Sequence, residues 1–298
     1  MSDTLRGAIY GILAASIWGG MYVVSDVVLE IIPPFTLLSI RLMMGAFVLG
    51  LLVWQKKDTT VPQRPQMIQV LGVGLIGFGV SVGAQFVGTD KSTAVNGALI
   101  TTSSPAFILV FAALILREKL SFQRVMAVIL ASIGVIVIID PAQANFSSDT
   151  FVGDVALAVA GVTWGLYSVL VRVVSAKLDT LWVTLIAFWG GMMLTIPSAG
   201  VELTSRAVGE ITFLVFLGIL YLGVISTAGA MWLWNRAFAL VDASAASLFF
   251  FAQPLVGAVL GVLALGQDFT PNLAFGGLLI SLGVLLAMYV PKRKSVPA

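Results

Sequence analysis

The chain has 298 residues, of which 59% are hydrophobic and only 10% are charged, with a net charge of +2. Soluble domains carry roughly 25% charged residues, so this composition excludes an ordinary soluble protein. The absence of cysteine and histidine excludes disulfides and thiolate or imidazole metal sites. We therefore predict an all-α membrane protein without metal or cofactor, and no nucleic-acid partner.

Apolar runs follow one another along the whole chain, each close to the ~20 residues that cross a bilayer core. The first run is too long for a signal peptide and lacks a small-residue cleavage site, so we expect it to be retained. Most prolines fall between the runs, where they end helices. The predicted spans number ten, at 7–29, 35–54, 67–88, 93–116, 123–140, 152–174, 181–197, 211–235, 243–264 and 271–290.

Lysine and arginine predict the orientation. With ten spans and an inner N-terminus, thirteen of the 16 basic residues fall in cytoplasmic segments, whereas only Lys91 and Arg206 fall in outer loops. Positive loops stay on the cytoplasmic side. We therefore expect a multi-pass protein of the inner (plasma) membrane with both termini in the cytoplasm.

The sequence repeats itself. Residues 94–140 align with 243–289, so that Pro105 matches Pro254, and Trp18 matches Trp164 with an offset of 146 residues. A copy with an odd number of spans must be followed by a copy in the opposite orientation. We predict two inverted five-helix repeats, at 1–145 and 146–298, with a substrate site between them near the bilayer midplane. Because one chain supplies both halves, a monomer is sufficient.

Two segments carry a family resemblance, LREKLSFQRVMAVILASIGVIVI at 116–138 and DASAASLFFFAQPLVGAVLGVLALGQDFTPNLAFGGLLISLGVLL at 242–286. They resemble the duplicated EamA-type domain of the drug/metabolite transporter superfamily. The second copy departs by having Gln267 in place of Glu118, and the first by having Ala127 in place of Gly276. The resemblance implies ten helices in inverted repeats and transport of small metabolites, often the export of amino acids.

Pro105 and Pro254 lie near the middle of their spans. Each lacks an N–H group and frees a carbonyl one turn earlier, which must meet protein or water inside a membrane. Ser104 and Gln253 precede the two prolines at matching positions. These are kinks that either line a central cavity with polar groups or serve helix packing.

Trp18 and Trp164 lie about half-way along their spans, each followed by a tyrosine, Tyr22 or Tyr167, about one turn later. Tryptophan prefers the membrane interface, so midplane rings need a reason. They form aromatic walls that stack on a substrate or bind an ammonium group, or they pack helices together.

Gln85 and Asn96 are amides within spans, and such groups face protein or a cavity rather than lipid. We expect both to contribute to substrate binding, whereas Asn235 lies near the inner end of its span, where water reaches it. Arg41 lies about two turns inside its span, at a depth similar to Asp26. We predict a structural ion pair between Asp26, or Glu30, and Arg41.

These features predict a secondary transporter of small zwitterionic metabolites, most simply amino acids. The sequence has no intramembrane histidine and no carboxylate near the midplane, which disfavours proton coupling and favours a facilitator. It has no P-loop, metal-ligand cluster or nucleophile–base pair, so we do not expect an enzyme. Alternatives are an exporter of drugs or quaternary cations, and a membrane sensor or assembly subunit that transports nothing.

Overall fold

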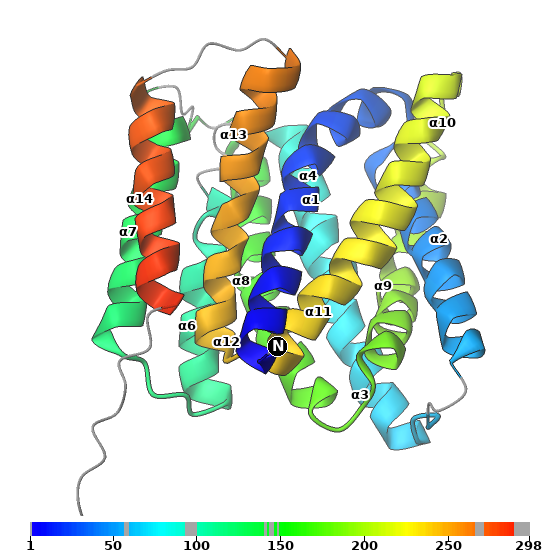
Figure 1. Ribbon diagram of the computed structural model, residues 1–298. Helices are drawn as coiled ribbons and strands as arrows, with labels where there is room; N and C mark the ends of the chain where they lie inside the picture. Colours follow the sequence, from blue (N-terminus) through cyan, green and yellow to red (C-terminus); the bar gives the residue numbers. More distant parts are fainter. Residues whose placement is uncertain are drawn as a thin grey trace, which may run out of the picture.

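The computed structural model describes residues 2–56, 60–92, 100–139, 142, 146–147, 149–265 and 271–288; the side chains of residues 22, 23, 26, 139, 258, 261–265, 273, 284, 287 and 288 lie outside this description. All regular secondary structure in the described ranges is helical. The helices run up and down in one bundle (Figure 1).

The first half is helical in its described part, and a π-helix interrupts one of its helices. Its elements are α1 (Asp3–Ile31), α2 (Pro34–Gln55), α3 (Arg64–Gly74), the π-helix η1 (Leu75–Ser81), α4 (Val82–Lys91), α6 (Ser104–Ile115) and α7 (Phe122–Ile139). The second half consists of α8 (Phe151–Ser175), α9 (Thr180–Glu202), α10 (Phe213–Leu220), the π-helix η3 (Tyr221–Gly229), α11 (Ala230–Leu240), α12 (Ala243–Ala246), the 3₁₀-helix η4 (Ser247–Phe251), α13 (Ala252–Leu265) and α14 (Pro271–Met288).

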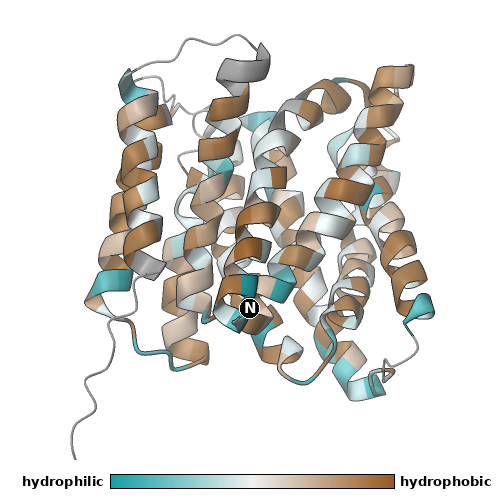
Figure 2. Ribbon diagram, in the orientation of Figure 1, coloured by the Kyte–Doolittle hydropathy of each residue, from teal (hydrophilic) through white to brown (hydrophobic). Residues whose placement is uncertain are grey.

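The outer surface of the bundle is apolar. Large side chains such as Phe47, Leu114 and Phe213 are 69%, 70% and 76% exposed. Hydrophilic residues concentrate toward the helix ends (Figure 2). In water this much exposed apolar surface would drive aggregation, so it faces lipid.

Five helical stretches within the described residues are long and apolar enough to cross a membrane: Pro34–Gln55, Arg64–Lys91, Phe151–Ser175, Thr180–Glu202 and Phe213–Leu240. Shorter apolar helices accompany them at Ser104–Ile115, Phe122–Ile138, Ala243–Gly257 and Ala274–Gly283. The chain is thus a multi-pass membrane protein, and the total of ten spans stays a prediction.

Equivalent helices of the two halves run in opposite directions. The beginning of α1 lies against the end of α11, because Gly7 adjoins Val241. The end of α8 reaches the same place, where Arg172 donates a hydrogen bond to the Val241 carbonyl. Since α1 and α8 carry the matching residues Trp18 and Trp164, this antiparallel placement is what an inverted repeat requires.

Some contacts between the halves occur twice, with the equivalent residues of the two copies interchanged. A Cβ built on Gly134 of α7 would lie 2.6 Å from the Gly276 carbonyl of α14, and one on Gly283 would lie 2.8 Å from the Ala127 carbonyl. Gly134 and Gly276 are the repeat partners of Gly283 and Ala127, so one contact maps onto the other. Ala127, which takes the place of the glycine found at Gly276 in the second copy, therefore lies in this close helix crossing.

The Trp-bearing helices show the same exchange. A Cβ on Gly19 of α1 would lie 3.0 Å from the backbone nitrogen of Gly257 in α13, and one on Gly165 of α8 would lie 3.1 Å from that of Ile108 in α6. Each Trp-bearing helix therefore packs closely on one Pro-bearing helix. This crossing brings the polar residues before Pro105 and Pro254 toward the two tryptophans.

Two helices are interrupted by π-helical segments at matching positions, Leu75–Ser81 and Tyr221–Gly229. They begin 146 residues apart, which is the offset between Trp18 and Trp164. Within the second segment the Thr227 hydroxyl donates to the Leu222 carbonyl five residues earlier. Short π-helical segments frequently occur at functional sites, and these two lie in the interior of the bundle.

The proline-bearing helices are also irregular. A turn at Thr102 and Ser103 precedes α6, which begins at Ser104 beside Pro105. In the second half the 3₁₀-helix Ser247–Phe251 leads into α13, in which Pro254 is the third residue. The backbone is therefore irregular just before each proline, in a different form in each half, and the role of the two prolines as kinks that line a cavity stays a prediction.

Candidate functional site

The centre of the bundle is filled by an aromatic cluster of four residues from three helices: Trp18 of α1, Trp164 and Tyr167 of α8, and Trp234 of α11. The centroids of Trp18 and Trp164 are 5.6 Å apart with the rings edge to face, and Trp18 lies 5.3 Å from Trp234. The exposed fractions are 3% for Trp18, 8% for Trp164 and zero for the other two. The predicted pair of tryptophans therefore meets at the contact between the repeats.

The indole groups of the cluster differ in their partners. Trp18 Nε1 donates to the Ser226 carbonyl of η3 at 3.1 Å, and Trp234 Nε1 donates to Ser168 Oγ at 3.3 Å. Trp164 Nε1 is buried and has no hydrogen-bond partner among the described residues. Leaving a buried donor unpaired costs roughly 1–3 kcal/mol of folding free energy. A ligand could accept a hydrogen bond from this indole without breaking any hydrogen bond within the protein.

A buried hydrogen-bond chain continues from the cluster toward the end of the bundle at which α1 begins, called here the N-terminal end. Tyr167 Oη donates to Asn235 Oδ1 at 2.9 Å, and Asn235 Nδ2 donates to Thr184 Oγ1 at 3.0 Å. Thr184 in turn donates to the Thr180 carbonyl. Asn235 is fully buried, so the expectation that it lies within reach of water was wrong.

Arg41 of α2 is a buried charged group that η3 links to the aromatic cluster. Its exposed fraction is 2%, and Nε donates to Thr227 Oγ1 at 3.0 Å. Thr227 follows Ser226, the residue that accepts the bond from Trp18. The guanidinium and the aromatic cluster are therefore anchored on consecutive residues of the same π-helical segment.

The other described contacts of Arg41 are with uncharged groups. Nη2 lies 3.2 Å from Met21 Sδ, and the guanidinium carbon lies 5.7 Å from the centre of the Phe86 ring. Nη1 has no hydrogen-bond partner in the described part of the chain. A buried cation normally has a charged partner, so Arg41 is poised to accept an anionic group. The Asp26 side chain lies outside the described residues, and its pairing with Arg41 stays a prediction.

Several predicted site residues adjoin the cluster. Ser104, which is 2% exposed, lies beside Gly161, one turn before Trp164, and the Gln253 carbonyl lies beside Gly19. Gln85 of α4 is half-buried and directly precedes Phe86, the ring beside Arg41. The Tyr22 side chain and Asn96 lie outside the described residues. Which of these residues touch a substrate stays a prediction.

Between the cluster and the N-terminal end of the bundle lies a polar network centred on Glu118, called here the Glu118 network. Glu118 accepts hydrogen bonds from the backbone nitrogens of Ala243 and Ser244 at 2.9 and 3.1 Å, and from Ser244 Oγ at 2.6 Å. Arg172 Nε lies 3.6 Å from Glu118, and Arg172 also pairs with Asp242 at 3.3 Å. The network thus joins the α6–α7 turn of the first half to α8 and α12 of the second.

Local backbone geometry positions Glu118. Arg117 has a φ of 55°, in the left-handed region, and the Glu118 nitrogen bonds to the Ala112 carbonyl. A non-glycine residue in this conformation carries a strain of roughly 1–2 kcal/mol. The chain therefore reverses sharply after α6, and the carboxylate meets the first turn of α12, where a negative charge is favoured.

At the opposite end of the bundle, hydrogen bonds and an ion pair also link the two halves. Glu202 at the end of α9 accepts hydrogen bonds from the backbone nitrogens of Phe35 and Thr36 at 3.1 and 2.9 Å. Arg206 pairs with Asp90 at 3.5 Å and donates to the Leu29 carbonyl at 2.7 Å. In this state, polar links between the halves are present at both ends, with the aromatic cluster between them.

Several residues of this arrangement could not be anticipated from the sequence. Trp234 faces the cluster because of the rotation of its helix about the helix axis, and the Ser226 carbonyl accepts a hydrogen bond from within a π-helical segment. Hydropathy reveals neither feature. Thr227 could have been suspected, because it matches Ser81 at the same position of the other π-helix. The described residues contain no group of three acidic residues that could hold a metal ion.

Comparison with known proteins gives the family. The model of the EamA-like transporter family matches the chain twice, at residues 5–140 and 151–289. The chain is 25% identical to "Uncharacterized transporter YoaV" of Bacillus subtilis, with 96% of this chain and 98% of that one covered. It is 26% identical to "Uncharacterized inner membrane transporter YicL" of Salmonella typhimurium, with 99% of both chains covered.

A curated transporter of Archaeoglobus fulgidus is 26% identical, over 92% of this chain and 94% of its own. A solved crystal structure superposes with a TM-score of 0.80 at 20% identity, covering 95% of this chain and 96% of that one, which supports the same fold. Both family matches together extend over nearly the whole chain, including all four residues of the aromatic cluster. The chain therefore belongs to the EamA-like transporter family of the drug/metabolite transporter superfamily.

Proposed function

We propose that this chain is a facilitative transporter of small zwitterionic metabolites, amino acids above all, and that it exports them across the inner membrane. In this proposal ten spans form two inverted repeats, the N-terminal end of the bundle faces the cytoplasm, and a single chain suffices. The substrate binds near the aromatic cluster, between the halves.

The observation that carries the substrate class is the buried guanidinium of Arg41. It donates hydrogen bonds to two uncharged groups, Thr227 Oγ1 and Met21 Sδ, and its Nη1 has no partner among the described residues. A carboxylate is the group that best matches a guanidinium, because two parallel hydrogen bonds form between opposite charges. The repeat partner of Arg41 is Ala187, so the site offers one cation and suits a single carboxylate.

The aromatic cluster supplies a complementary surface for the other end of a zwitterion. The faces of Trp18, Trp164 and Trp234 attract an ammonium group by cation–π interaction, worth about 2 kcal/mol when water is excluded. The free Nε1 of Trp164 offers one more donor. In the present state the rings contact one another, so substrate entry requires them to separate.

Alternating access follows from the two sets of polar links. Opening toward the cytoplasm breaks the Glu118 network, whereas opening to the other side breaks the contacts of Glu202 and Arg206 with the first half. Each opening requires the halves to rock about the central cluster, as inverted repeats allow.

The test compares ligands with and without a carboxylate in proteoliposomes of the purified chain. Uptake of a labelled amino acid should be inhibited by other amino acids, and not by their amides or by the corresponding amines. Arg41→Gln should raise the KM roughly tenfold or more, the usual effect of losing a charge-assisted hydrogen bond. Arg64→Gln removes an exposed cation and should leave the KM unchanged.

Inhibition by amines and quaternary ammonium compounds as strong as that by amino acids would contradict the carboxylate assignment and favour a drug or cation exporter. Absence of saturable flux for every ligand class would favour a role as a sensor or assembly subunit. Because Arg41 is buried, thermal unfolding of Arg41→Gln is measured in parallel, and Arg41→Lys, which retains the charge, should restore part of the affinity.

A further inference from the structure

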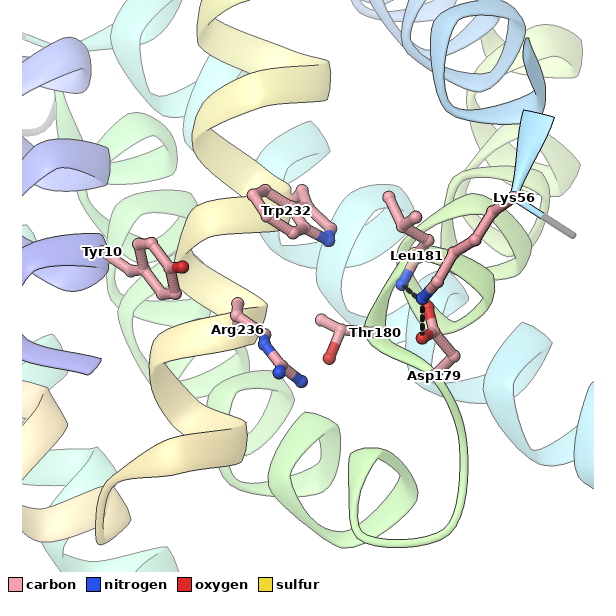
Figure 3. Close-up of a pocket in the computed structure, with 7 residues that line it drawn as sticks. All are labelled: Tyr10, Lys56, Asp179, Thr180, Leu181, Trp232 and Arg236. Carbon is pink, nitrogen blue, oxygen red and sulfur yellow. Dashed lines mark hydrogen bonds and ion pairs between the residues drawn. The ribbon is translucent and has the colours of Figure 1, made fainter. Parts of the chain in front are cut away.

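A second polar pocket lies at the N-terminal end of the bundle, away from the aromatic cluster. Its volume is about 190 Å³, and it is bounded by the beginning of α1, the end of α2, the beginning of α9 and the end of α11. We call it the Arg236 pocket (Figure 3). The residues that line it are Tyr10, Lys56, Asp179, Thr180, Leu181, Trp232 and Arg236.

The pocket lies on a different face of α11 from the candidate transport site. Trp232 and Arg236 are one turn apart and share a face of the helix, whereas Trp234 and Asn235 turn toward the centre of the bundle. On α1, Ile9 and Leu13 beside Tyr10 are 38% and 47% exposed, so lipid reaches the neighbourhood of the pocket. A ligand could therefore enter from the membrane interface.

The pocket holds one cation in excess. Lys56 Nζ lies 2.6 Å from Asp179 Oδ2, and Asp179 also accepts a hydrogen bond from the Leu181 nitrogen at the start of α9. The charges of Lys56 and Asp179 thus compensate each other. Arg236 is half-buried and has no ion pair within the described part of the chain. The positive end of the α9 dipole adds to its charge.

Two buried polar atoms of the pocket lack partners among the described residues. Thr180 Oγ1 belongs to a side chain that is 2% exposed, and Trp232 Nε1 belongs to a ring that stacks at 6.0 Å on Tyr10. In Figure 3 the indole nitrogen, the hydroxyl and the guanidinium of Arg236 all point into the space between α11 and the start of α9. Leaving such groups unpaired is costly, so their convergence indicates a ligand.

We propose that the Arg236 pocket binds the phosphate group of an anionic phospholipid of the cytoplasmic leaflet. Arginine recognises phosphate oxygens through paired hydrogen bonds, and Trp232 and Thr180 supply two more donors. The aromatic residues suit the level of the headgroups, and basic pockets between helices on the cytoplasmic side bind such lipids. The acyl chains would lie along the exposed apolar face of α1.

The test is native mass spectrometry of the purified full-length chain in detergent, titrated with phosphatidylglycerol. Arg236→Gln should weaken lipid binding about tenfold, and Trp232→Phe, which removes the N–H and keeps a ring, about threefold. Arg64→Gln, the loss of an exposed cation predicted on the same membrane side, is the matched control and should change binding less than twofold. Phosphatidylcholine should bind more weakly than phosphatidylglycerol.

Equal losses for Arg236→Gln and Arg64→Gln, or none for Arg236→Gln, would overturn the proposal. Inorganic phosphate that displaces phosphatidylglycerol at comparable concentration would overturn the lipid assignment and leave a soluble phosphate as the ligand. Thermal unfolding of each variant identifies misfolding, and Trp232→Phe then carries the test. Lipid binding is read without transport, so the outcome is independent of the proposed function.

Discussion

At the scale of single residues, the site is built from groups whose hydrogen-bonding capacity is incompletely used. Trp18 and Trp234 are satisfied by Ser226 and Ser168, whereas Trp164 Nε1 and Arg41 Nη1 have no partner among the described residues. A folded core normally pairs such groups, because each unpaired one costs free energy of folding. That Trp164 and Arg41 use these groups to bind a ligand is part of the proposed function.

Substitution of Trp18 and of Trp164 should affect stability differently, because only the Trp18 indole has a hydrogen-bond partner in the described structure. Trp18→Phe removes the N–H that pairs with the Ser226 carbonyl and should lower the free energy of unfolding by about 1–3 kcal/mol. Trp164→Phe breaks no hydrogen bond in the described structure and should cost less stability, while still raising the KM for transport. Thermal unfolding and initial uptake rates measure the two effects, and unchanged transport affinity in Trp18→Ala and Trp164→Ala would refute a binding role for the cluster.

At the scale of elements, several pairs of helices cross closely at small residues, in addition to the packing of large side chains in the core. Packing, rather than water exclusion, drives helix association inside lipid, and small residues let backbones approach. The crossing of α7 and α14 at Gly134, Gly276 and Gly283 is the clearest example, since its contacts exchange between the two halves. This crossing lies apart from the aromatic cluster, since its buried apolar residues belong to a separate part of the core.

Glycine substitutions test this account of the crossing. A Cβ at Gly134 would lie 2.6 Å from a backbone oxygen of α14, which cannot move aside cheaply, whereas a Cβ at Gly50 has no neighbour within 4 Å. Gly134→Ala should therefore destabilise the protein by roughly 1–3 kcal/mol. Gly50→Ala should be neutral or slightly stabilising, because alanine favours helix. Equal melting temperatures for the two variants would show that the α7–α14 contact is not a close one.

Much of the element order could be predicted from the sequence, and the reasons are physical. Apolar runs and prolines locate the helices, and the duplication of Trp18-Gly19 as Trp164-Gly165 indicates that the rings occupy equivalent places. The rotation of a helix about its axis is a different matter, because a segment that is apolar all round carries no amphipathic signal. Asn235 was therefore placed near water, and the contact of Arg41 with the π-helix that also accepts the bond from Trp18 was not foreseen.

At the scale of the whole molecule, the two halves form two sets of polar contacts, one at each end of the bundle. The Glu118 network links them at the N-terminal end, and Glu202 and Arg206 link them at the other. A transporter that exposes its site to one side at a time must break one set while it keeps the other. The stability of each set thus governs which side opens.

Weakening one set should bias the protein toward one open state. Glu118→Gln removes the charge that pairs with Arg172 and should expose the interior from the N-terminal end. Because the chain has no cysteine, a single reporter can be introduced at the buried Ser247, one turn beyond Ser244. Maleimide labelling of Ser247→Cys should become several-fold faster with Glu118→Gln, as expected when an interaction of roughly 1 kcal/mol is lost. Glu202→Gln at the other end is the matched control, and acceleration of equal size by both substitutions would contradict separate gates.

The most direct test of the central claim is exchange of labelled amino acids into proteoliposomes of the purified chain, preloaded with unlabelled amino acid, without pH gradient or membrane potential. We predict saturable accumulation of label that requires the α-carboxylate and is reduced in Arg41→Gln. Exchange that is absent without an imposed gradient would contradict a facilitator. Exchange that proceeds equally well for amines and in Arg41→Gln would contradict the carboxylate-binding site on which the proposed function depends.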